Sequence, residues 1–214
     1  MEQILVFGTG GHAKVVIDIV EKQYHVSGLI DISPPKISSL WNYPYLGTEN
    51  DIGSLGIFQG IIAVGDNGVR QKIAEKIISL VPKFRFITAI HPSAQIGRGV
   101  EILPGAVIMA GACINADTRI GAHGIINTRA SIDHDCVIED FVSIAPGVTI
   151  GGNVRVGHGS AIGLGASIIH NVSIGAHALI GAGAVVIKDL PEHVVAYGVP
   201  CRIIRRRETG DPYL

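Results

Sequence analysis

The chain has 214 residues, a formal net charge of −1 and a sequence pI near 6.7. Because so little net charge produces no long-range field for a polyanion, we expect no nucleic-acid partner. The three cysteines are odd in number and lack CxxC spacing. This pattern supports neither a disulfide framework nor a zinc knuckle, and it is typical of a reducing compartment.

The N-terminus has one short apolar run, residues 4–7, before a series of glycines. Neither a signal peptide nor a membrane span has this form. Residues 102–116 carry no charge, but their proline and glycines argue against a transmembrane helix. We therefore expect a cytoplasmic protein with no membrane partner.

Residues 1–88 alternate between short apolar runs and amphipathic segments. The expected strands are 4–7, 26–30, 61–64 and 84–87, and the expected helices are 13–24 and 69–80. Strands that alternate with helices imply a parallel sheet, here a small Rossmann-like domain. Residues 33–60, which include Trp41, show no pattern that assigns them to an element.

A glycine-rich segment, residues 8–14, follows the first strand, opens the first helix and fits the pattern G-x-G-x-x-[G/A]. Glycines let the backbone approach a pyrophosphate, and a helix N-terminus offers free N–H groups. Asp31, at the end of the next strand, can accept from a ribose or a base. A nucleotide-type ligand is favoured over a purely structural turn, although roughly ninety residues are too few for a full NAD fold.

A second loop, Gly65-Asp66-Asn67-Gly68, follows the third strand. It can supply another edge for a sugar or a phosphate. It can also cap the next helix through Asp66 or Asn67, and the two interpretations are compatible.

From residue 94 to residue 189 an aliphatic side chain returns at every sixth position. The series from 96 to 186 is isoleucine, with valine at 156 and 186, and the residue two positions earlier is always small or β-branched. A period of six fits neither a helix nor long strands. We expect short strands and tight turns that repeat around a shared interior, beginning after His91-Pro92-Ser93.

The Ile-Gly and Val-Gly pairs in these hexads resemble the hexapeptide-repeat acyltransferases. The resemblance implies a left-handed parallel β-helix with three hexads per triangular coil, an exception to the usual right-handed crossover. Residues eighteen apart then stack in columns. The expected fold class is an α/β Rossmann-like N-terminal domain (residues 1–88) followed by an all-β left-handed β-helix with a C-terminal tail (residues 89–214).

His134 and Asp135 interrupt the plain repeat and fall at a corner, where side chains project outward. An imidazole beside a carboxylate can act as a general base, because the carboxylate orients the ring and stabilises its charged form. The columns place Gly152 one coil along, which leaves space beside the ring, and His170 two coils along. Solvated corner side chains are expected for His123, His158, His170 and His177. No metal is expected, because the histidines show no ligand spacing.

Several motifs together resemble the bacterial sugar acyltransferases of the PglD/NeuD/PerB type, over essentially the whole chain. They are the segment 8–14, residues 63–67 with Arg70, Ile90-His91-Pro92, the block from Asn127-Thr128 to His134-Asp135-Cys136, and Gly198-Val199-Pro200. Members of this family transfer acetyl from acetyl-CoA to nucleotide-linked amino sugars, commonly as homotrimers with active sites between subunits.

The resemblance also assigns roles to residues of this sequence. His134 becomes the general base and Asp135 the carboxylate that raises its basicity. The nucleotide sugar would contact Gly10, Gly11, His12, Lys14, Asp31, Gly65, Asn67 and Gly68. Acetyl-CoA would contact Ser143, Gly152, Leu164, Ala182 and Pro200. Ser143 stands where many relatives have His. The Gly152 N–H is the expected oxyanion donor.

We therefore expect an acetyl-CoA-dependent N-acetyltransferase for an amino sugar such as a UDP-4-amino-4,6-dideoxyhexose, with no metal. The alternatives are an O-acetyltransferase of the sialic acid type and a non-catalytic nucleotide-binding scaffold. Tight UDP or GDP binding by residues 1–88 would favour the first function over the O-acetyltransferase.

Overall fold

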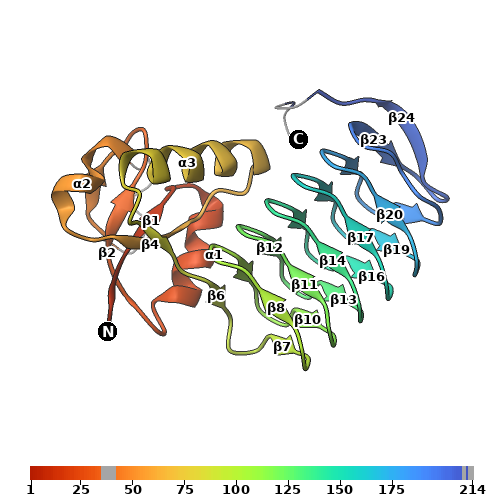
Figure 1. The fold of residues 1–214 in the computed structure, drawn as a ribbon, viewed down its shortest axis with the longest axis horizontal. Coiled ribbons are helices and arrows are strands. Elements are labelled where there is room, and N and C mark those ends of the chain that lie inside the picture. The colour runs from red at the N-terminus through yellow and green to blue at the C-terminus, as the bar shows by residue number, and fades with distance from the viewer. Residues whose placement is uncertain (35–41, 209–210, 212–214) are drawn as a thin grey trace.

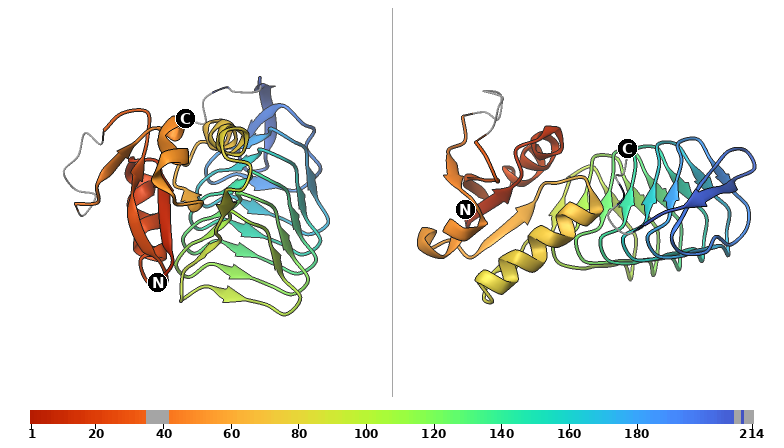
Figure 2. Two further views of the ribbon diagram at one scale, coloured as in Figure 1. Left: turned by 60° about the vertical axis from the view of Figure 1, so that its left-hand side comes forward. Right: turned by 90° about the horizontal axis from the view of Figure 1, so that it is seen from above.

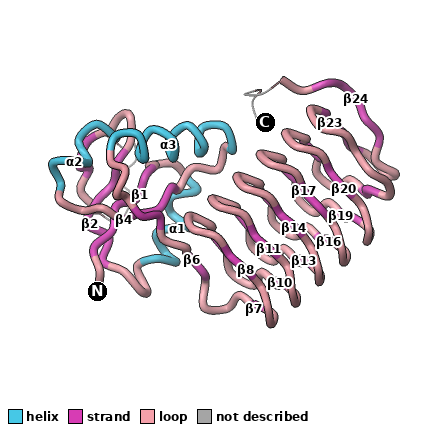
Figure 3. The backbone as a smooth tube through the Cα atoms, viewed as in Figure 1, coloured by secondary structure: helices cyan, strands magenta, loops and turns pink. Residues whose placement is uncertain are grey.

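Two architectures follow one another along the chain, an α/β domain and then a long β-helix (Figure 1). The computed structural model describes residues 1–34, 42–208 and 211. Within these residues every helix precedes residue 81, and the rest of the chain consists of strands and turns (Figure 3). Trp41 lies outside the described residues.

The α/β domain is built on a five-stranded parallel sheet with the order β3-β2-β1-β4-β5. Its elements are β1 (Gln3–Phe7), α1 (Gly11–Val20), β2 (His25–Ile30), β3 (Tyr45–Gly47), η1 (Glu49–Asp51), α2 (Ile52–Leu55), β4 (Gln59–Ile62), α3 (Asn67–Leu80) and β5 (Arg85–Phe86). The predicted strands and helices are confirmed with shifts of a few residues. The first helix was expected to end at residue 24, which was wrong: it ends at Val20, and residues 21–23 form a turn. The unassigned segment contributes β3, η1 and α2.

The strand order changes direction at β1, which pairs with β2 on one side and β4 on the other. In an open parallel sheet, ligands bind outside the carboxyl ends of the strands at such a switch point. The glycine-rich segment follows β1 and the Gly65 loop follows β4, so the fold brings the two loops together. Gly8 has φ +116°, and a Cβ on it would lie 2.9 Å from Ala63 O, so only glycine fits where the loops meet.

The β-helix consists of two-residue strands in three parallel sheets, which we call faces 1, 2 and 3. Face 1 contains β6 (Ala89–Ile90), β9 (Val107–Ile108), β12 (Ile125–Ile126), β15 (Ser143–Ile144), β18 (Ala161–Ile162) and β21 (Leu179–Ile180). Face 2 contains β7 (Gln95–Ile96), β10 (Cys113–Ile114), β13 (Ser131–Ile132), β16 (Thr149–Ile150), β19 (Ser167–Ile168) and β22 (Val185–Val186). Face 3 contains β8 (Glu101–Ile102), β11 (Arg119–Ile120), β14 (Val137–Ile138), β17 (Arg155–Val156) and β20 (Ser173–Ile174).

Strand pairing confirms the predicted columns. Cys113 pairs with Ser131 and Ile125 with Ser143, in each case eighteen residues along the chain. The hexad isoleucines and valines from 108 to 186 are at most 3% exposed and form one core, whereas Ile96 in the first coil is 39% exposed. Glycine follows many of them because coils stack closely: a Cβ on Gly157 would lie 2.5 Å from Ala176 N. The left-handed β-helix expected from the repeat is thus the fold of this region.

A hairpin closes the C-terminal end of face 1. β23 (Val194–Tyr197) pairs in parallel with β21, and β24 (Arg202–Arg206) pairs antiparallel with β23. At the other end, the last strand of the α/β sheet, β5, is followed within three residues by β6, the first strand of face 1.

The α/β domain packs against face 1 (Figure 2). An apolar cluster joins Val16 and Ile17 of α1 to Val107, Met109 and Ile125 of the β-helix. The N-terminal end of α3 contacts the corner between faces 3 and 1. In the described part of the chain, no helix is long and apolar enough to cross a membrane.

Candidate active site

His134 and Asp135 lie in the turn between β13 and β14, at the corner between faces 2 and 3. Asp135 has φ +58°, the left-handed conformation that lets the chain turn this corner. Both side chains project outward, with 58% and 60% of their surface exposed. The Nδ1 atom of His134 lies 2.7 Å from Oδ2 of Asp135. The carboxylate is thus hydrogen-bonded to Nδ1, and Nε2 is directed away from it.

Two neighbouring carboxylates set the electrostatics of His134. The hydrogen bond to Asp135, and then the charge of Asp133, raise the pKa of His134 above its usual value. Asp133 in turn accepts from Asn115 Nδ2 and from the His134 N–H, both at 2.9 Å, and these bonds lower the pKa of its carboxyl group. Sequence reasoning missed Asn115 and Asp133, although their separation of eighteen places them in one column.

Gly152 lies directly beside the imidazole, as the column rule predicted. A Cβ at this position would be 2.8 Å from both Cε1 and Nε2 of His134. The backbone of the next coil holds the two in register, since Asn153 N donates to His134 O at 2.9 Å. The absence of a side chain therefore keeps Nε2 accessible to a small reacting group.

The candidate nucleotide site lies at the carboxyl edge of the α/β sheet. Asp31 is held there by Thr9 Oγ1, which donates to Oδ2 at 2.6 Å, and by Ile32 N, which donates to Oδ1 at 2.7 Å. Helix α1 begins at Gly11, and its N-cap Gly10 provides no side-chain cap. A Cβ on Gly10, Gly11 or Gly65 would meet no atom within 4 Å, so these backbones border open space. Lys14 is half-buried on α1.

The second loop serves as a helix cap. Asp66 accepts from Val69 N at 2.8 Å, which confirms the capping interpretation for this residue. A Cβ on Gly68 would meet only Asp66 Oδ1, at 3.6 Å. The loop therefore remains open on its outer side.

Asn67 and Ser143, assigned above to the nucleotide sugar and to acetyl-CoA, lie together between the α/β domain and face 1. Both are 5% exposed. The Ser143 hydroxyl donates to Asn67 Oδ1 and accepts from Arg70 Nη2 at 3.1 Å. Their polar atoms are bonded within the chain, so the structure places neither side chain in an open ligand site.

Two further histidines differ from expectation. His123 is 7% exposed and stacks on Phe141 with ring centroids 4.9 Å apart, so the solvated corner expected for it was wrong. Its ring fills the space over Gly105 in the preceding coil. His12 has a buried Nε2 with no hydrogen-bond partner. Burial, and then the charge of Arg70, lower the pKa of each of these imidazoles to about 4.

The other residues assigned to acetyl-CoA lie on two different corners of the β-helix and in the C-terminal hairpin. Leu164 and Ala182 are exposed and stack in one column between faces 1 and 2, where Gly183 N donates to Leu164 O at 2.8 Å. Gly152 lies on the corner between faces 2 and 3, and Pro200 is exposed in the turn before β24. These positions border the two edges of face 2.

The two candidate sites of one chain do not meet. The α/β domain covers face 1, whereas His134 lies on the corner opposite that face. Among the described residues, no group of three or more His, Cys, Asp or Glu could hold a metal.

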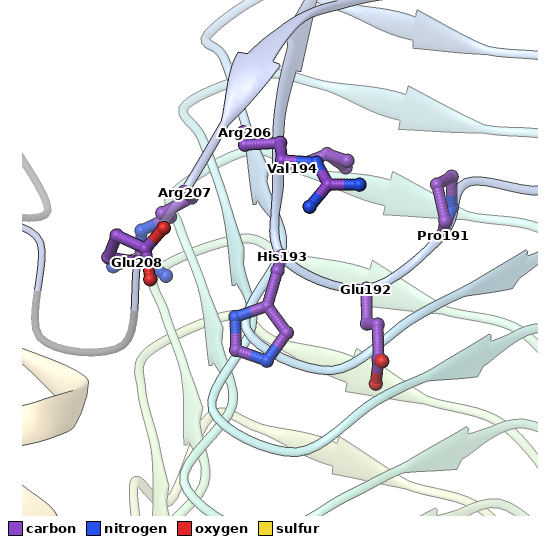
Figure 4. Close-up of a pocket in the computed structure, with 7 residues that line it drawn as sticks. All are labelled: Pro191, Glu192, His193, Val194, Arg206, Arg207 and Glu208. Atoms are coloured by element: carbon purple, nitrogen blue, oxygen red, sulfur yellow. The ribbon is translucent and has the colours of Figure 1, made fainter.

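A separate cavity of about 460 Å³ lies at the C-terminal end, lined by Pro191, Glu192, His193, Val194, Arg206, Arg207 and Glu208 (Figure 4). It contains none of the residues assigned above. His193, which lines it, contacts the ring of His177 on the corner between faces 3 and 1. Its lining mixes two acidic and two basic side chains with one imidazole, so it has no clear charge preference.

Comparison with known proteins identifies the family. Residues 3–77 match the family model of the PglD N-terminal domain. PerB from Caulobacter crescentus, solved in complex with CoA and GDP-perosamine, is 37% identical, with a TM-score of 0.89 over 96% of this chain and 98% of that chain. The acetyltransferase domain of PglB from Neisseria gonorrhoeae, solved with acetyl coenzyme A, is 33% identical, with a TM-score of 0.86 over 95% and 99%.

WeeI from Acinetobacter baumannii is 28% identical, with a TM-score of 0.84 over 94% of this chain and 100% of that chain. No curated protein sequence matches the chain. The solved structures share both domains with it, because each match extends over nearly the full length of both proteins. The chain is therefore an acyltransferase and belongs to the PglD/PerB family of sugar acetyltransferases.

Proposed function

We propose that the protein is an acetyl-CoA-dependent N-acetyltransferase that acetylates the amino group of a nucleotide-linked amino sugar, for example a UDP-4-amino-4,6-dideoxyhexose. The observation that carries the proposal is the corner at which His134 Nδ1 lies 2.7 Å from Asp135 while Gly152 borders Nε2. PerB, which was solved with CoA and GDP-perosamine, and PglB, which was solved with acetyl coenzyme A, support this class of substrate and co-substrate.

In this mechanism His134 Nε2 accepts a proton from the sugar amine as the nitrogen attacks the thioester carbonyl. Asp135 keeps the second proton of the ring on Nδ1 and stabilises the imidazolium that forms. The Gly152 N–H donates to the developing oxyanion. When the tetrahedral intermediate collapses, the C–S bond breaks and the imidazolium returns the proton to the thiolate of CoA.

Substrate binding is assigned to the carboxyl edge of the α/β sheet. The backbone at Gly10 and Gly11 and the N-terminus of α1 would hold the diphosphate, with His12 and Lys14 beside them. Asp31 would accept from the base or ribose, and the loop at Gly65 and Gly68 would border the diphosphate and the sugar attached to it.

The reaction in this proposal takes place between subunits. Because His134 lies opposite face 1, a second copy of the chain must present the nucleotide sugar to it. Acetyl-CoA would lie along face 2, between Gly152 of one copy and the Leu164, Ala182 and Pro200 side of another. A homotrimer, the assembly implied by the family resemblance, satisfies this requirement with three identical sites.

The direct test replaces His134 by alanine and measures acetyl-CoA consumption with a panel of UDP-, GDP- and dTDP-linked amino sugars. Loss of the general base should lower kcat by roughly 10² to 10⁴ while acetyl-CoA binding is retained. His170, exposed two coils along the same column, provides the matched control, and H170A should keep wild-type turnover. A near-normal kcat for H134A would refute the assignment of the base. Consumption with free sugars alone would instead favour an O-acetyltransferase.

A further inference from the structure

The side chain of Arg70 joins the α/β domain to two successive coils of the β-helix. Arg70 is 1% exposed. Its Nη1 donates to Val64 O at 3.0 Å and Gly65 O at 2.9 Å, within the loop that follows β4. Its Nε donates to His123 O at 2.9 Å and its Nη2 to Phe141 O at 3.0 Å, on the corner between faces 3 and 1.

Asn67 extends this contact to a third coil. Its Nδ2 donates to Gly159 O at 3.0 Å and to Ser160 O at 2.9 Å, and its Oδ1 accepts from Arg70 Nη2 at 3.1 Å. Residues 123, 141 and 159 are spaced by eighteen, so the contacts follow one column of the β-helix. The loop between β4 and α3 is thus anchored to the β-helix directly through Asn67, and indirectly through the guanidinium of Arg70, which also bonds to the loop carbonyls.

The two sides of this loop have different surroundings. On the inner side, its carbonyl groups are bonded to the guanidinium of Arg70. On the outer side, a Cβ on Gly65 would meet no atom within 4 Å. The outer side is therefore the one available to a ligand, and Arg70 lies behind the loop rather than in contact with that ligand.

We propose that Arg70, Asn67 and Ser143 form an interdomain clamp that holds the Gly65–Gly68 loop in position to bind the nucleotide sugar. Arg70 is then a positioning residue for the substrate. The inference rests on the proposed function, because it assigns the loop to the nucleotide-sugar site. It also replaces the acetyl-CoA role that the sequence suggested for Ser143.

The chemistry of the clamp requires arginine. A guanidinium presents five N–H donors in a rigid planar fork, which suits several carbonyl groups on different segments. A lysine ammonium has three donors at one point and cannot reach both domains in the same geometry. Domain docking has a second support, because the apolar cluster around Val16 and Met109 joins α1 to face 1 independently of Arg70.

The test uses the full-length protein and isothermal titration with UDP, GDP and dTDP, followed by steady-state kinetics with the corresponding amino sugar. R70K should weaken binding of the preferred nucleotide at least about tenfold and raise the KM for the nucleotide sugar similarly, with the KM for acetyl-CoA unchanged. S143A removes one hydroxyl from the clamp and should weaken nucleotide binding about two- to fivefold. M109A, in the apolar part of the same interface, should lower the melting temperature and leave nucleotide affinity unchanged.

Unchanged nucleotide affinity in a folded R70K variant would overturn the clamp, and if R70K does not fold, S143A decides the question in the same way. A rise in the KM for acetyl-CoA with S143A would also overturn it, in favour of a cofactor contact. Failure of the wild-type protein to bind any of the three nucleotides would refute the proposed nucleotide site, and the clamp with it. Nucleotide binding without turnover would contradict only the proposed catalysis.

Discussion

Histidines in two regions of the molecule differ in their surroundings and in their chemistry. At the outer corner, His134 is more than half exposed, bonded to Asp135 and close to Asp133, and its pKa is raised. At the domain interface, His12 and His123 are close to Arg70, and burial lowers the pKa of each to about 4. The same side chain takes up a proton more readily where carboxylates and water surround it, and less readily where it is buried beside a cation.

Of the variants that test this contrast, Asp135→Asn should have the largest effect, a loss of kcat. Asparagine tolerates the left-handed backbone at this corner, so the fold should be retained. Without the carboxylate the imidazolium is less stable, and kcat should fall about 100-fold. Because the neutral ring is the base in the proposed mechanism, wild-type activity should decline as pH falls through the raised pKa of His134.

In the Asp135→Asn variant this acidic limb should move to lower pH, which a pH profile of kcat/KM measures. An unchanged limb would show that Asp135 does not set the pKa of the group responsible for that limb. E101Q, on an exposed face of the first coils, removes a carboxylate without approaching the site and should leave the profile unchanged.

A smaller loss of activity should follow from Gly152→Ala. The new Cβ would lie 2.8 Å from Cε1 and Nε2 of His134, so the ring must rotate away or lose access on that side. We expect kcat to fall about tenfold, because catalysis requires precise placement of the base. Gly53 borders open space, so G53A is the control and should keep wild-type kcat. Equal activities of the two variants would show that the space beside Nε2 is not used.

The smallest effect concerns stability at the interface. The pKa of His123 is lowered from its ordinary value of 6.5 to about 4 in the folded protein, so the unfolded chain binds more protons between these pH values. Stability is therefore lost as pH falls from about 6.5 to about 4, at a slope of at most about 1.4 kcal/mol per pH unit from this group. His123→Phe keeps a ring against Phe141 and removes the titration, so its urea midpoint should depend less on pH over this range.

His170, which is exposed, is the control for that measurement, and H170A should reproduce the wild-type pH dependence. His12 titrates in the same sense and remains in the His123→Phe variant, so a reduced slope rather than a flat one is expected. A slope equal to that of the wild type would show that His123 is protonated in the folded state.

The β-helix and the position of its His134 corner could be predicted closely because their geometry is periodic. Once hexads are assigned three to a coil, residue number alone determines face and column. The contact between His134 and Gly152 followed from a separation of eighteen, and Asn115 and Asp133 could have been found in the same way. Three strands of the α/β sheet, β1, β2 and β4, were also readable, because each is a short, largely buried run between turns, whereas the half-buried β3 was not.

The contacts between the two domains could not be predicted in this way. Nothing in the local pattern around Ser143 distinguishes a side chain that faces a cofactor from one that bonds to Asn67, seventy-six residues earlier. The buried state of His123 likewise depends on Arg70 of α3 and on Phe86, which contact it from another part of the chain.

The sequence by itself thus determined the two folds, the outward corner of His134 and Asp135, and the glycine next to the ring, since short-range repeats specify all of these. Only the tertiary structure decided where the α/β domain is placed, that Arg70 and Asn67 together reach three coils, and that the two glycine-containing loops of the α/β domain and His134 are on different sides of one chain. The reason is physical: docking depends on the surfaces that remain after each domain has folded, and no periodic pattern in the sequence encodes which of those surfaces meet.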